Sequence, residues 1–538
     1  MRTKKRAILA NAEKPEPGLL PWLFVNILII QMRKVLSTLL SILVIVLSAC
    51  NSASPTPLPA ATREQAPAPT AHPSILPPAP QPTPQPATPV PPASPTPLVQ
   101  TIRYPLPAYT LQAALDYPVG QMVIRQHLGF TNLTGEPLSD LRFYAETNRY
   151  PDTLTLDSLL VNGKEFDNFL LNRNVLILSF PGQSIEPLQS LEIDFIYTIQ
   201  LPEMHSRAGN GLFGKSQWQI NLFDWYFWLA AYSPEEGWLI HPPAGFAEHT
   251  TYPLANFQLL LTVQDPPENL MVTGSSDALV AGNTYQFAHP AARSLVVSMS
   301  PNFEMVECSQ AGVTVHHYFF PIHKQTAEWV LQSTCQAVEI YSKIISPYRH
   351  PVLNIIETNL IDGLEGDGMY FLGSAFYTLG TEPRSLLTIL AIHETAHQWW
   401  YAGVANDQAL EPWLDESFAT FMEGIYYENT SGDDFNWWKG YRLAGNPAKE
   451  VVNSPLYDFR IFRPYRNAVY LRGASFLMDL KKEMGEEKFQ SFLQQYYQRA
   501  STPQLSSSEL FFSVLSEYDV PEAAKLLDKY FLLIEDEN

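Results

Sequence analysis

Two histidines, His393 and His397, lie four residues apart in a segment, 385–401, that lacks helix breakers and has helical apolar spacing. Residues at positions i and i+4 lie on one face of a helix, about one turn apart. Two imidazoles in this arrangement can both bind one zinc ion at about 2.0–2.1 Å. Glu394 follows the first histidine and can face a water molecule on that ion. The segment therefore predicts a helix that carries part of a metal site.

A third ligand is expected, because a catalytic zinc site uses three protein ligands and one open position. Eighteen residues lie between His397 and Glu416, and the apolar residues after Glu416 are spaced as in a second helix. Glu416 would complete a His-His-Glu set. Glu423, seven residues further on, lies on the same helical face. It either steadies a ligand histidine or is an ordinary surface glutamate, and the sequence leaves both open.

These motifs carry a family resemblance. HETAHQWW, the 18-residue gap and WLDESFATF resemble the gluzincin metallopeptidases of the aminopeptidase N and leukotriene-A hydrolase family (peptidase family M1). In that family eighteen residues lie between the second histidine of HExxHQW and the glutamate of WLNEGFA; here Asp415 and Ser417 stand in place of Asn and Gly. The resemblance implies zinc held by His393, His397 and Glu416. It implies that Glu394 takes the proton of a zinc-activated water as that water attacks the scissile carbonyl.

A second motif of the family lies upstream of the zinc helix and has the form GxMEN. Here the segment 362–368 reads DGLEGDG, with Leu364 in place of Met and Gly366 in place of Asn. The resemblance implies that Glu365 binds the free α-amino group of the substrate. The alternative is that Glu365 is a solvated loop acid.

A third motif of the family is Y-x-K-G-A, downstream of the zinc ligands. Here Tyr470 opens the segment YLRGA, with Arg472 in place of Lys. The resemblance implies that the Tyr470 hydroxyl stabilises the oxyanion of the tetrahedral intermediate. Tyr465 is the nearby alternative.

The chain from residue 101 onwards divides into two parts. Residues 101–305 contain alternating runs such as Leu191 to Ile199 and short apolar runs such as Val175 to Phe180, separated by turn residues, which predict strands. Residues 306–538 are mostly helical in pattern, with helices expected over 325–345 and 385–401. The resemblance implies an α+β fold, with a saddle-like β domain followed by a thermolysin-like catalytic domain.

The N-terminal region has the pattern of a lipoprotein precursor. Met32, Arg33 and Lys34 precede the apolar run 35–49, which ends in Leu-Ser-Ala before Cys50. This is the anatomy of a secretory signal peptide over 32–49, and its end resembles the bacterial lipobox, whose cysteine receives lipid. Translation is expected to begin at Met32, which would make 1–31 a mis-assigned extension.

Residues 50–100 are expected to form an extended stalk. Residues 51–100 hold 17 of the 46 prolines and only two charged residues, so they cannot bury enough apolar surface to form a core. A lipid on Cys50 would then hold the folded part near the outside of a bacterial cell membrane. Cys308 and Cys335 either form a disulfide or stay as two buried thiols, and the sequence leaves both open.

The function that the sequence favours is a surface-anchored zinc aminopeptidase that acts on peptides. The formal net charge of −20 argues against a nucleic-acid partner, because such binding needs cations that neutralise phosphates. Two alternatives remain. One is an endopeptidase or another hydrolase on the same zinc site, such as an epoxide hydrolase. The other is a non-catalytic surface binding protein, against which the intact Glu394 and Tyr470 argue.

Overall fold

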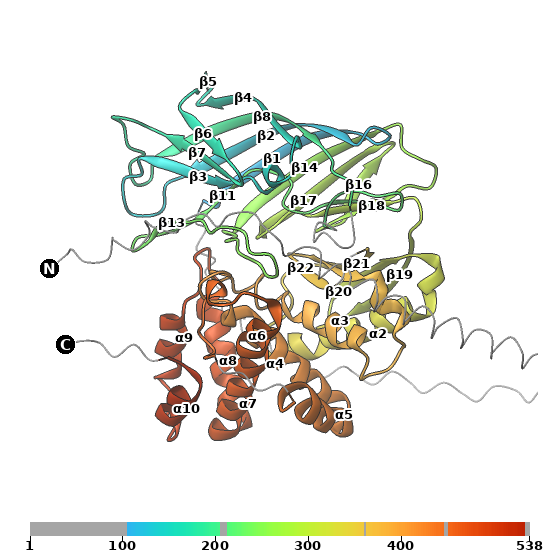
Figure 1. Ribbon diagram of the computed structural model, residues 1–538, viewed down its shortest axis with the longest axis vertical. Helices are drawn as coiled ribbons and strands as arrows, with labels where there is room; N and C mark the ends of the chain where they lie inside the picture. Colours follow the sequence, from blue (N-terminus) through green and yellow to red (C-terminus); the bar gives the residue numbers. More distant parts are fainter. Residues whose placement is uncertain (1–104, 205–211, 360–361, 446–449, 533–538) are drawn as a thin grey trace, which may run out of the picture. The chain divides into compact units, whose positions relative to one another are not determined.

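The computed structural model describes residues 105–204, 212–359, 362–445 and 450–532, within one compact unit, Leu98–Asn538. A β-rich part comes first along this unit, and a mixed part rich in helices follows it (Figure 1). The expected extension 1–31, signal peptide 32–49, lipid site Cys50 and stalk 50–100 lie outside the described residues. Within the described ranges, every helix is too short or too polar to cross a membrane.

The β-rich part is built on an eight-stranded sheet in the order β16-β17-β14-β1-β2-β8-β4-β5, with smaller sheets beside it. In chain order its strands are β1 (Ala108–Asp116), β2 (Gln121–Thr131), β3 (Asp140–Tyr144), β4 (Leu154–Val161), β5 (Lys164–Glu165), β6 (Phe169–Asn172), β7 (Val175–Ser179), β8 (Ser190–Gln200), β9 (Phe213–Lys215), β10 (Ile220–Leu222), β11 (Trp228–Leu229), β12 (Ala231–Ser233), β13 (Gly237–Leu239), β14 (Ala255–Gln264), β15 (Met271–Gly274), β16 (Ala278–Ala281), β17 (Thr284–Ala292) and β18 (Val297–Ser300).

Alternation of apolar and polar residues places one face of this sheet in the core. In β8 the residues Leu191, Ile193, Phe195, Tyr197 and Ile199 are buried, while the intervening side chains are more exposed. This is the period of two that the sequence predicts for a strand with one buried face.

A five-stranded sheet lies at the start of the second part, in the order β19-β20-β21-β23-β22. Its strands are β19 (Glu304–Gln310), β20 (Val313–Phe319), β21 (Val352–Thr358), β22 (Gly363–Gly366) and β23 (Met369–Gly373). Strands β20, β21 and β23 are parallel, and β22 pairs with β23 in the antiparallel sense. Every residue of β21 and β23 is buried, as expected for parallel strands covered on both faces.

Helices cover one face of this sheet and form the remainder of the second part (Figure 1). They are α2 (Lys324–Ile344), α3 (Leu386–Ala396), α4 (Trp413–Thr430), α5 (Gly432–Trp437), α6 (Phe462–Arg466), α7 (Gly473–Met484), α8 (Glu486–Ala500), α9 (Ser508–Leu515) and α10 (Ala523–Tyr530), with π-helical turns η4 (Trp438–Leu443) and η6 (Asn467–Arg472) and short 3₁₀ turns η1 (Glu146–Arg149), η2 (Pro321–His323), η3 (Ser374–Thr378) and η5 (Leu456–Asp458).

The first predicted helix agrees with α2 to within one residue at each end, but the second is wrong at its C-terminus. Helix α3 ends at Ala396, five residues before the predicted end at Tyr401. The chain turns because the Ala402 N–H donates to the His397 carbonyl at 2.9 Å, and Tyr401 adopts a φ of 127°. His397 therefore occupies the C-cap of the helix rather than its interior.

Cys308 and Cys335 form a disulfide, which settles the choice that the sequence leaves open. The bond ties β19 to α2, which also packs against β19 and β20. The disulfide therefore links the edge of the five-stranded sheet to its first covering helix.

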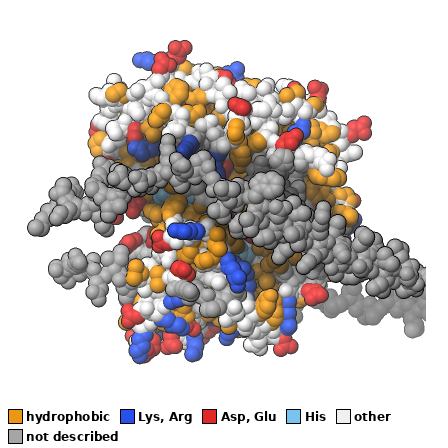
Figure 2. Space-filling model, viewed as in Figure 1, with side chains coloured by type: hydrophobic (Ala, Val, Ile, Leu, Met, Phe, Trp, Pro, Cys, Tyr) orange, Lys and Arg blue, Asp and Glu red, His pale blue; other side chains and the backbone are white. Residues whose placement is uncertain are grey.

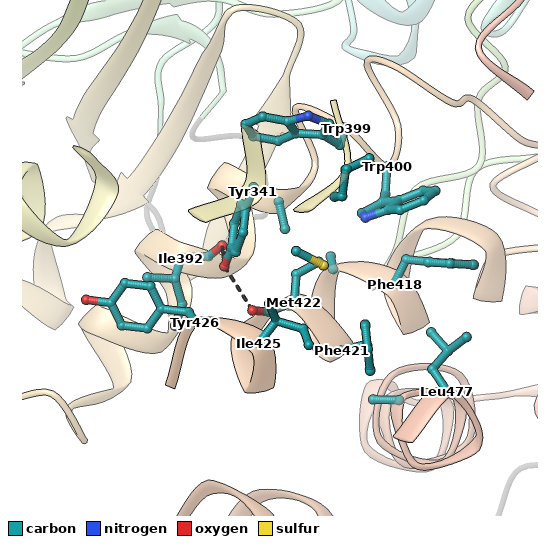
Figure 3. Close-up of a cluster of buried hydrophobic side chains, with 14 of the residues drawn as sticks. Tyr341, Ile392, Trp399, Trp400, Phe418, Phe421, Met422, Ile425, Tyr426 and Leu477 are labelled. Carbon is teal, nitrogen blue, oxygen red and sulfur yellow. Dashed lines mark hydrogen bonds between the residues drawn. The ribbon is translucent and has the colours of Figure 1, made fainter. Parts of the chain in front are cut away.

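An aromatic core lies between α2, α3 and α4 (Figure 3). The Tyr341 hydroxyl lies 3.1 Å from the carbonyl oxygens of both Ile392 in α3 and Met422 in α4. The rings of Trp400 and Phe418 stack with centroids 4.2 Å apart. These contacts fix α3 against α4, and each of the two helices carries predicted metal ligands.

Acidic and basic side chains are interspersed on the face shown in Figure 2, over both the β-rich and the helical elements. On that face, neither the acidic nor the basic side chains form one large patch.

Candidate active site

The two histidines of α3 are oriented by hydrogen bonds at their Nδ1 atoms. His393 Nδ1 lies 3.0 Å from Glu423 Oε1, and His397 Nδ1 lies 2.9 Å from the Trp400 carbonyl oxygen. Both acceptors require an N–H on Nδ1, so in the neutral ring Nε2 carries the lone pair. The two Nε2 atoms face each other at 3.2 Å. Both imidazoles are thus prepared to bind one cation.

Glu416 completes the site from α4. Its Oε2 atom lies 3.3 Å from His393 Nε2 and 3.5 Å from His397 Nε2. A tetrahedral zinc ion with bonds of about 2.0–2.1 Å needs ligand atoms roughly 3.3–3.4 Å apart. The three separations of 3.2, 3.3 and 3.5 Å match that requirement. The residues present therefore fit zinc, as the sequence predicts.

Burial and charge shape the ionisation of these ligands. Burial alone would lower the pKa of His393, but hydrogen bonds to Glu416 and Glu423 raise it to about 9. Burial would raise the pKa of Glu416, whereas His393 and His397 bring it to about 2. The carboxylates around the two imidazoles thus favour a positive charge at this place, which a bound cation can supply instead of protons on the rings. This is an environment that suits a bound cation.

Glu394 lies next to the ligands, but its carboxylate is not hydrogen-bonded to them. Its Oε2 atom is buried and has no hydrogen-bond partner among the described residues. Burial raises its pKa to about 8, against the opposing effect of His397 and His393. Gly363 of β22 makes room for the side chain, because a Cβ at that position would lie 2.3 Å from Glu394 Oε1.

Glu423 is not an ordinary surface glutamate, because its side chain is fully buried. Besides His393, its carboxylate accepts hydrogen bonds from Trp438 Nε1 at 2.9 Å and from Arg442 Nε at 2.7 Å. Burial would raise its pKa, but Arg442 and His393 lower it to about 2. An ionised Glu423 therefore holds the His393 ring in place and keeps its Nδ1 protonated.

Glu365 lies in the buried site rather than in a solvated loop. One of its carboxylate oxygens, one of Glu394 and a ring nitrogen of His397 lie within 4.8 Å of one another. Its Oε1 accepts a hydrogen bond from Gln408 at 3.1 Å, and the same amide lies 3.3 Å from Asp415 Oδ2. Glu365 thus reaches the zinc site from the sheet and keeps a carboxylate beside it.

The register of β22 explains why Glu365 points this way. Leu364 pairs with Phe371 and packs with it on one face of the sheet, while Glu365 pairs with Tyr370, which packs on the other face with the helices. Gln398, directly after His397, fixes the turn after β22 through the Gly366 carbonyl at 3.0 Å. Strand alternation therefore directs Glu365 towards α3.

A buried ionic cluster holds the other side of the same turn. Asp367 accepts hydrogen bonds from Arg349 at 2.9 Å, from His350 at 2.8 Å and from the Arg293 N–H at 2.7 Å. His289, in β17, lies 3.1 Å from the Asp367 carbonyl oxygen. Because Arg349 already neutralises the carboxylate, we interpret this cluster as a structural tie between the β-rich part and β22.

Tyr470 is the tyrosine at the metal site. Its hydroxyl donates to Glu416 Oε1, and its ring stacks on His393 with centroids 5.8 Å apart and an interplanar angle of 4°. Tyr465, the alternative, is almost wholly buried and packs against Phe459 and Phe246. Tyr470 lies in the π-helical turn η6, a distortion that is frequent at functional sites.

Gln408 carries no sequence signal, although its side chain positions Glu365. Its role depends on a contact between distant segments, so fixed spacing could not reveal it. Gln398, which holds the turn after β22, is the Gln of the HExxHQW motif.

The chain was compared with known proteins. Residues 374–530 match the peptidase family M1 domain. This chain carries a domain of peptidase family M1. Endoplasmic reticulum aminopeptidase 1 of Homo sapiens is 25% identical over 242 residues, which cover 41% of this chain and 25% of that protein. Probable aminopeptidase 1 of Sulfurisphaera tokodaii is 29% identical over 214 residues, covering 34% of this chain and 26% of that protein.

The fold agrees with that of solved M1 enzymes. An M1 zinc metallopeptidase from Deinococcus radiodurans superposes with a TM-score of 0.56 at 16% identity, covering 79% of this chain and 94% of that one. The predicted α+β fold, a β-rich domain followed by a mostly helical metallopeptidase domain, is confirmed. The chain matches about a quarter of the length of the two curated relatives named above.

We predict that Glu423→Gln weakens zinc binding about 10- to 100-fold, the usual effect of removing a partner that orients a ligand histidine. The neutral amide loses the charge that fixes His393 and leaves Arg442 without its carboxylate. Competition with a chelator measures the affinity. Glu428→Gln, on the exposed side of the same helix, is the control and should bind zinc like the unaltered protein. Equal affinity in all three proteins would contradict the role of Glu423.

Proposed function

We propose that this protein is a zinc-dependent aminopeptidase that removes N-terminal residues from peptides. The observation that carries the proposal is the approach of Glu365 to the His393, His397 and Glu416 site. Carboxylate and imidazole atoms of Glu365, Glu394 and His397 lie within 4.8 Å of one another. A buried carboxylate at that distance suits the ammonium group of a peptide N-terminus and would place the first peptide bond near the metal.

The chemistry follows from the groups around the site. Zinc held by His393, His397 and Glu416 would polarise a carbonyl and lower the pKa of a water molecule to about 7. Glu394 is the general base: it takes the proton from the attacking water and passes it to the leaving amine. Its carboxylate is free to do so, because Oε2 has no hydrogen-bond partner among the described residues. A pKa raised by burial favours both transfers.

Tyr470 supplies the hydrogen bond for the developing oxyanion. Its hydroxyl donates to Glu416 and its ring stacks on His393, so it lies beside two of the metal ligands. A neutral phenol is the better donor, and burial raises its pKa well above the usual value. The group therefore stays protonated through the working pH range.

Two other functions remain as alternatives. An endopeptidase or another hydrolase would use the same zinc, Glu394 and Tyr470 but would have no need for a buried Glu365. A non-catalytic binding protein would need neither the base nor the hydroxyl. The presence of all three groups around one site supports the aminopeptidase.

We also propose that the protein works outside the cytoplasm, held to the outer face of the cell membrane by a lipid on Cys50. The support is the signal-peptide pattern over 32–49, the lipobox before Cys50 and the proline-rich stretch behind it. The disulfide between Cys308 and Cys335 supports an oxidising compartment.

The zinc-loaded full chain should hydrolyse a peptide with a free N-terminus and leave its acetylated twin nearly uncut, because the acetyl group removes the ammonium that pairs with Glu365. Product release is followed by chromatography, with and without a chelator. Glu394→Gln is the control: it should keep one zinc ion and lose hydrolysis. Equal cleavage of both peptides would favour an endopeptidase, and zinc binding without any cleavage would favour a binding protein.

Tyr470→Phe should lower turnover by about 10²–10³, the usual cost of losing one oxyanion donor, while zinc content stays unchanged. The turnover number on the free-amine peptide and the zinc stoichiometry of the same sample check this. Tyr465→Phe is the matched variant and should remain close to the unaltered enzyme. If Tyr465→Phe lowers turnover and Tyr470→Phe does not, Tyr465 is the oxyanion donor and Tyr470 is not.

The full chain, expressed in a bacterium that processes lipoproteins, should incorporate labelled palmitate and fractionate with membranes. Cys50→Ala removes the acceptor thiol, so the label should be lost. Cys308→Ala serves as the comparison, because it removes a thiol that the disulfide already uses. Label on the Cys50→Ala protein, or none on the unaltered one, would refute the anchor.

A further inference from the structure

A turn between the two zinc-binding helices carries the side chain that holds Glu365 in place. The turn spans 407–411, and a hydrogen bond from the Glu411 N–H to the Asp407 carbonyl at 2.8 Å closes it. Gln408 is its second residue, and its amide nitrogen lies 3.1 Å from Glu365 Oε1. Among the described residues, it is the one side chain that donates to that carboxylate. The place of the turn therefore decides the direction of Glu365.

The amide of Gln408 is fixed by two acceptors. Besides Glu365, its nitrogen lies 3.3 Å from Asp415 Oδ2, so each of its two N–H groups has a partner. The side chain is only 4% exposed, so water competes little for these hydrogen bonds. A hydrogen bond on one oxygen of Glu365 fixes the side-chain rotamer and leaves the other oxygen for an ammonium group.

Asp407 shapes this turn with one carboxylate oxygen and joins it to the β-rich part with the other. Its Oδ1 accepts hydrogen bonds from the N–H groups of Ala409 and Leu410, both at 3.0 Å. Its Oδ2 lies 2.7 Å from His241 Nε2, which is the donor because a carboxylate oxygen accepts. The side chains of His241 and Asp407 are 12% and 10% exposed, so this contact is largely removed from water.

His241 belongs to the frame of the β-rich part. It lies two residues after β13, and its N–H donates to the Tyr144 hydroxyl at 3.4 Å. The same hydroxyl donates to the Leu239 carbonyl at 3.1 Å. Tyr144 lies in β3 and is wholly buried. The imidazole therefore reaches the turn from a firmly held position.

The short turn η5 makes further contacts at the same junction. The Tyr457 hydroxyl donates to the Pro242 carbonyl at 2.7 Å, and the ring lies 6.4 Å from that of His241. The Leu456 N–H donates to the Ala409 carbonyl at 2.8 Å. These bonds end on main-chain carbonyls, so a substitution at His241 leaves their partners in the chain. Losing the imidazole should shift the turn without unfolding it.

We infer that His241 and Asp407 are positioning residues for the binding of the substrate amine. His241 holds Asp407 from the β-rich part, Asp407 shapes the turn, and Gln408 in that turn directs Glu365. This inference rests on the proposed aminopeptidase function. Both residues act through Glu365 and not by contact with the peptide. Loss of the hydrogen bond between them should therefore weaken the binding of a free N-terminus and leave zinc affinity unchanged.

The first test uses the full zinc-loaded chain with His241→Phe, which removes the donor but keeps a planar ring beside Tyr457. Its kcat/KM for a free-amine peptide should fall about 10- to 100-fold, mainly through KM, because a small displacement of an anchoring group is costly. His241→Gln keeps an N–H donor and should recover most of the loss. His127→Phe is the control: it removes a histidine that lies 2.8 Å from Asp194 at an exposed site of the β-rich part, and should leave kcat/KM unchanged.

Double substitutions show whether His241 acts through Glu365. In the Glu365→Gln protein the charge that binds the amine is already lost, so adding His241→Phe should lower kcat/KM no further. Gln408→Met removes the amide but keeps a chain of similar length, and should reproduce the effect of His241→Phe. The two changes together should cost no more than either one, because they break the same series of contacts.

A binding measurement separates positioning from catalysis and from folding. In the zinc-loaded Glu394→Gln protein, calorimetry should show that His241→Phe weakens a free-amine peptide and leaves its acetylated twin unchanged. If His241→Phe keeps full kcat/KM, lowers it equally with and without Glu365, or lowers zinc affinity, then His241 is not a positioning residue for the amine. If the unaltered enzyme cleaves neither peptide, or both equally, the proposed function itself fails.

Discussion

The close approach of α3 and α4 is the constraint on which the site depends. It brings two imidazole nitrogens and a carboxylate oxygen within 3.5 Å of one another at a buried position. Charged groups there are stable only when hydrogen-bonded or paired. His393 and its partner Glu423 therefore need Arg442, which comes from the π-helical turn η4. The metal site thus lies at one end of a buried series of hydrogen bonds that runs from His393 through Glu423 to Arg442.

The five-stranded sheet links this chain to the β-rich part. Alternation along β22 sends Leu364 to one face and Glu365 to the other, so the same strand packs on the β-rich part and supplies the site. Asp367, two residues on, binds Arg349 and His350 in the buried tie. A shift between the two parts would therefore be felt at Glu365, because the turn that carries it is held from both sides.

Short-range pattern could predict much of the site and the fold. The i, i+4 histidines and the helical spacing after Glu416 place the ligands, and the alternation in β8 predicts its buried face. The sequence does not predict the end of α3, because residues 398–401 lack helix breakers. The helix ends where the Ala402 N–H donates to the His397 carbonyl, which the local pattern does not indicate. The sequence could not decide whether Cys308 and Cys335 form a disulfide, because the bond depends on β19 and α2 lying side by side in the fold. Gln408 belongs to the same category, because only the assembled chain gives it its neighbours Glu365 and Asp415.

The two departures from the family motif beside Glu416 have different consequences. Ser417 fits because Gly473 has no side chain; a Cβ there would lie 1.7 Å from Ser417 Oγ. That hydroxyl also donates to the Val469 carbonyl at 2.6 Å, which ties α4 to the turn that carries Tyr470. Asp415, by contrast, adds an acid to a site already rich in them, and its engagement with Gln408 lessens the cost.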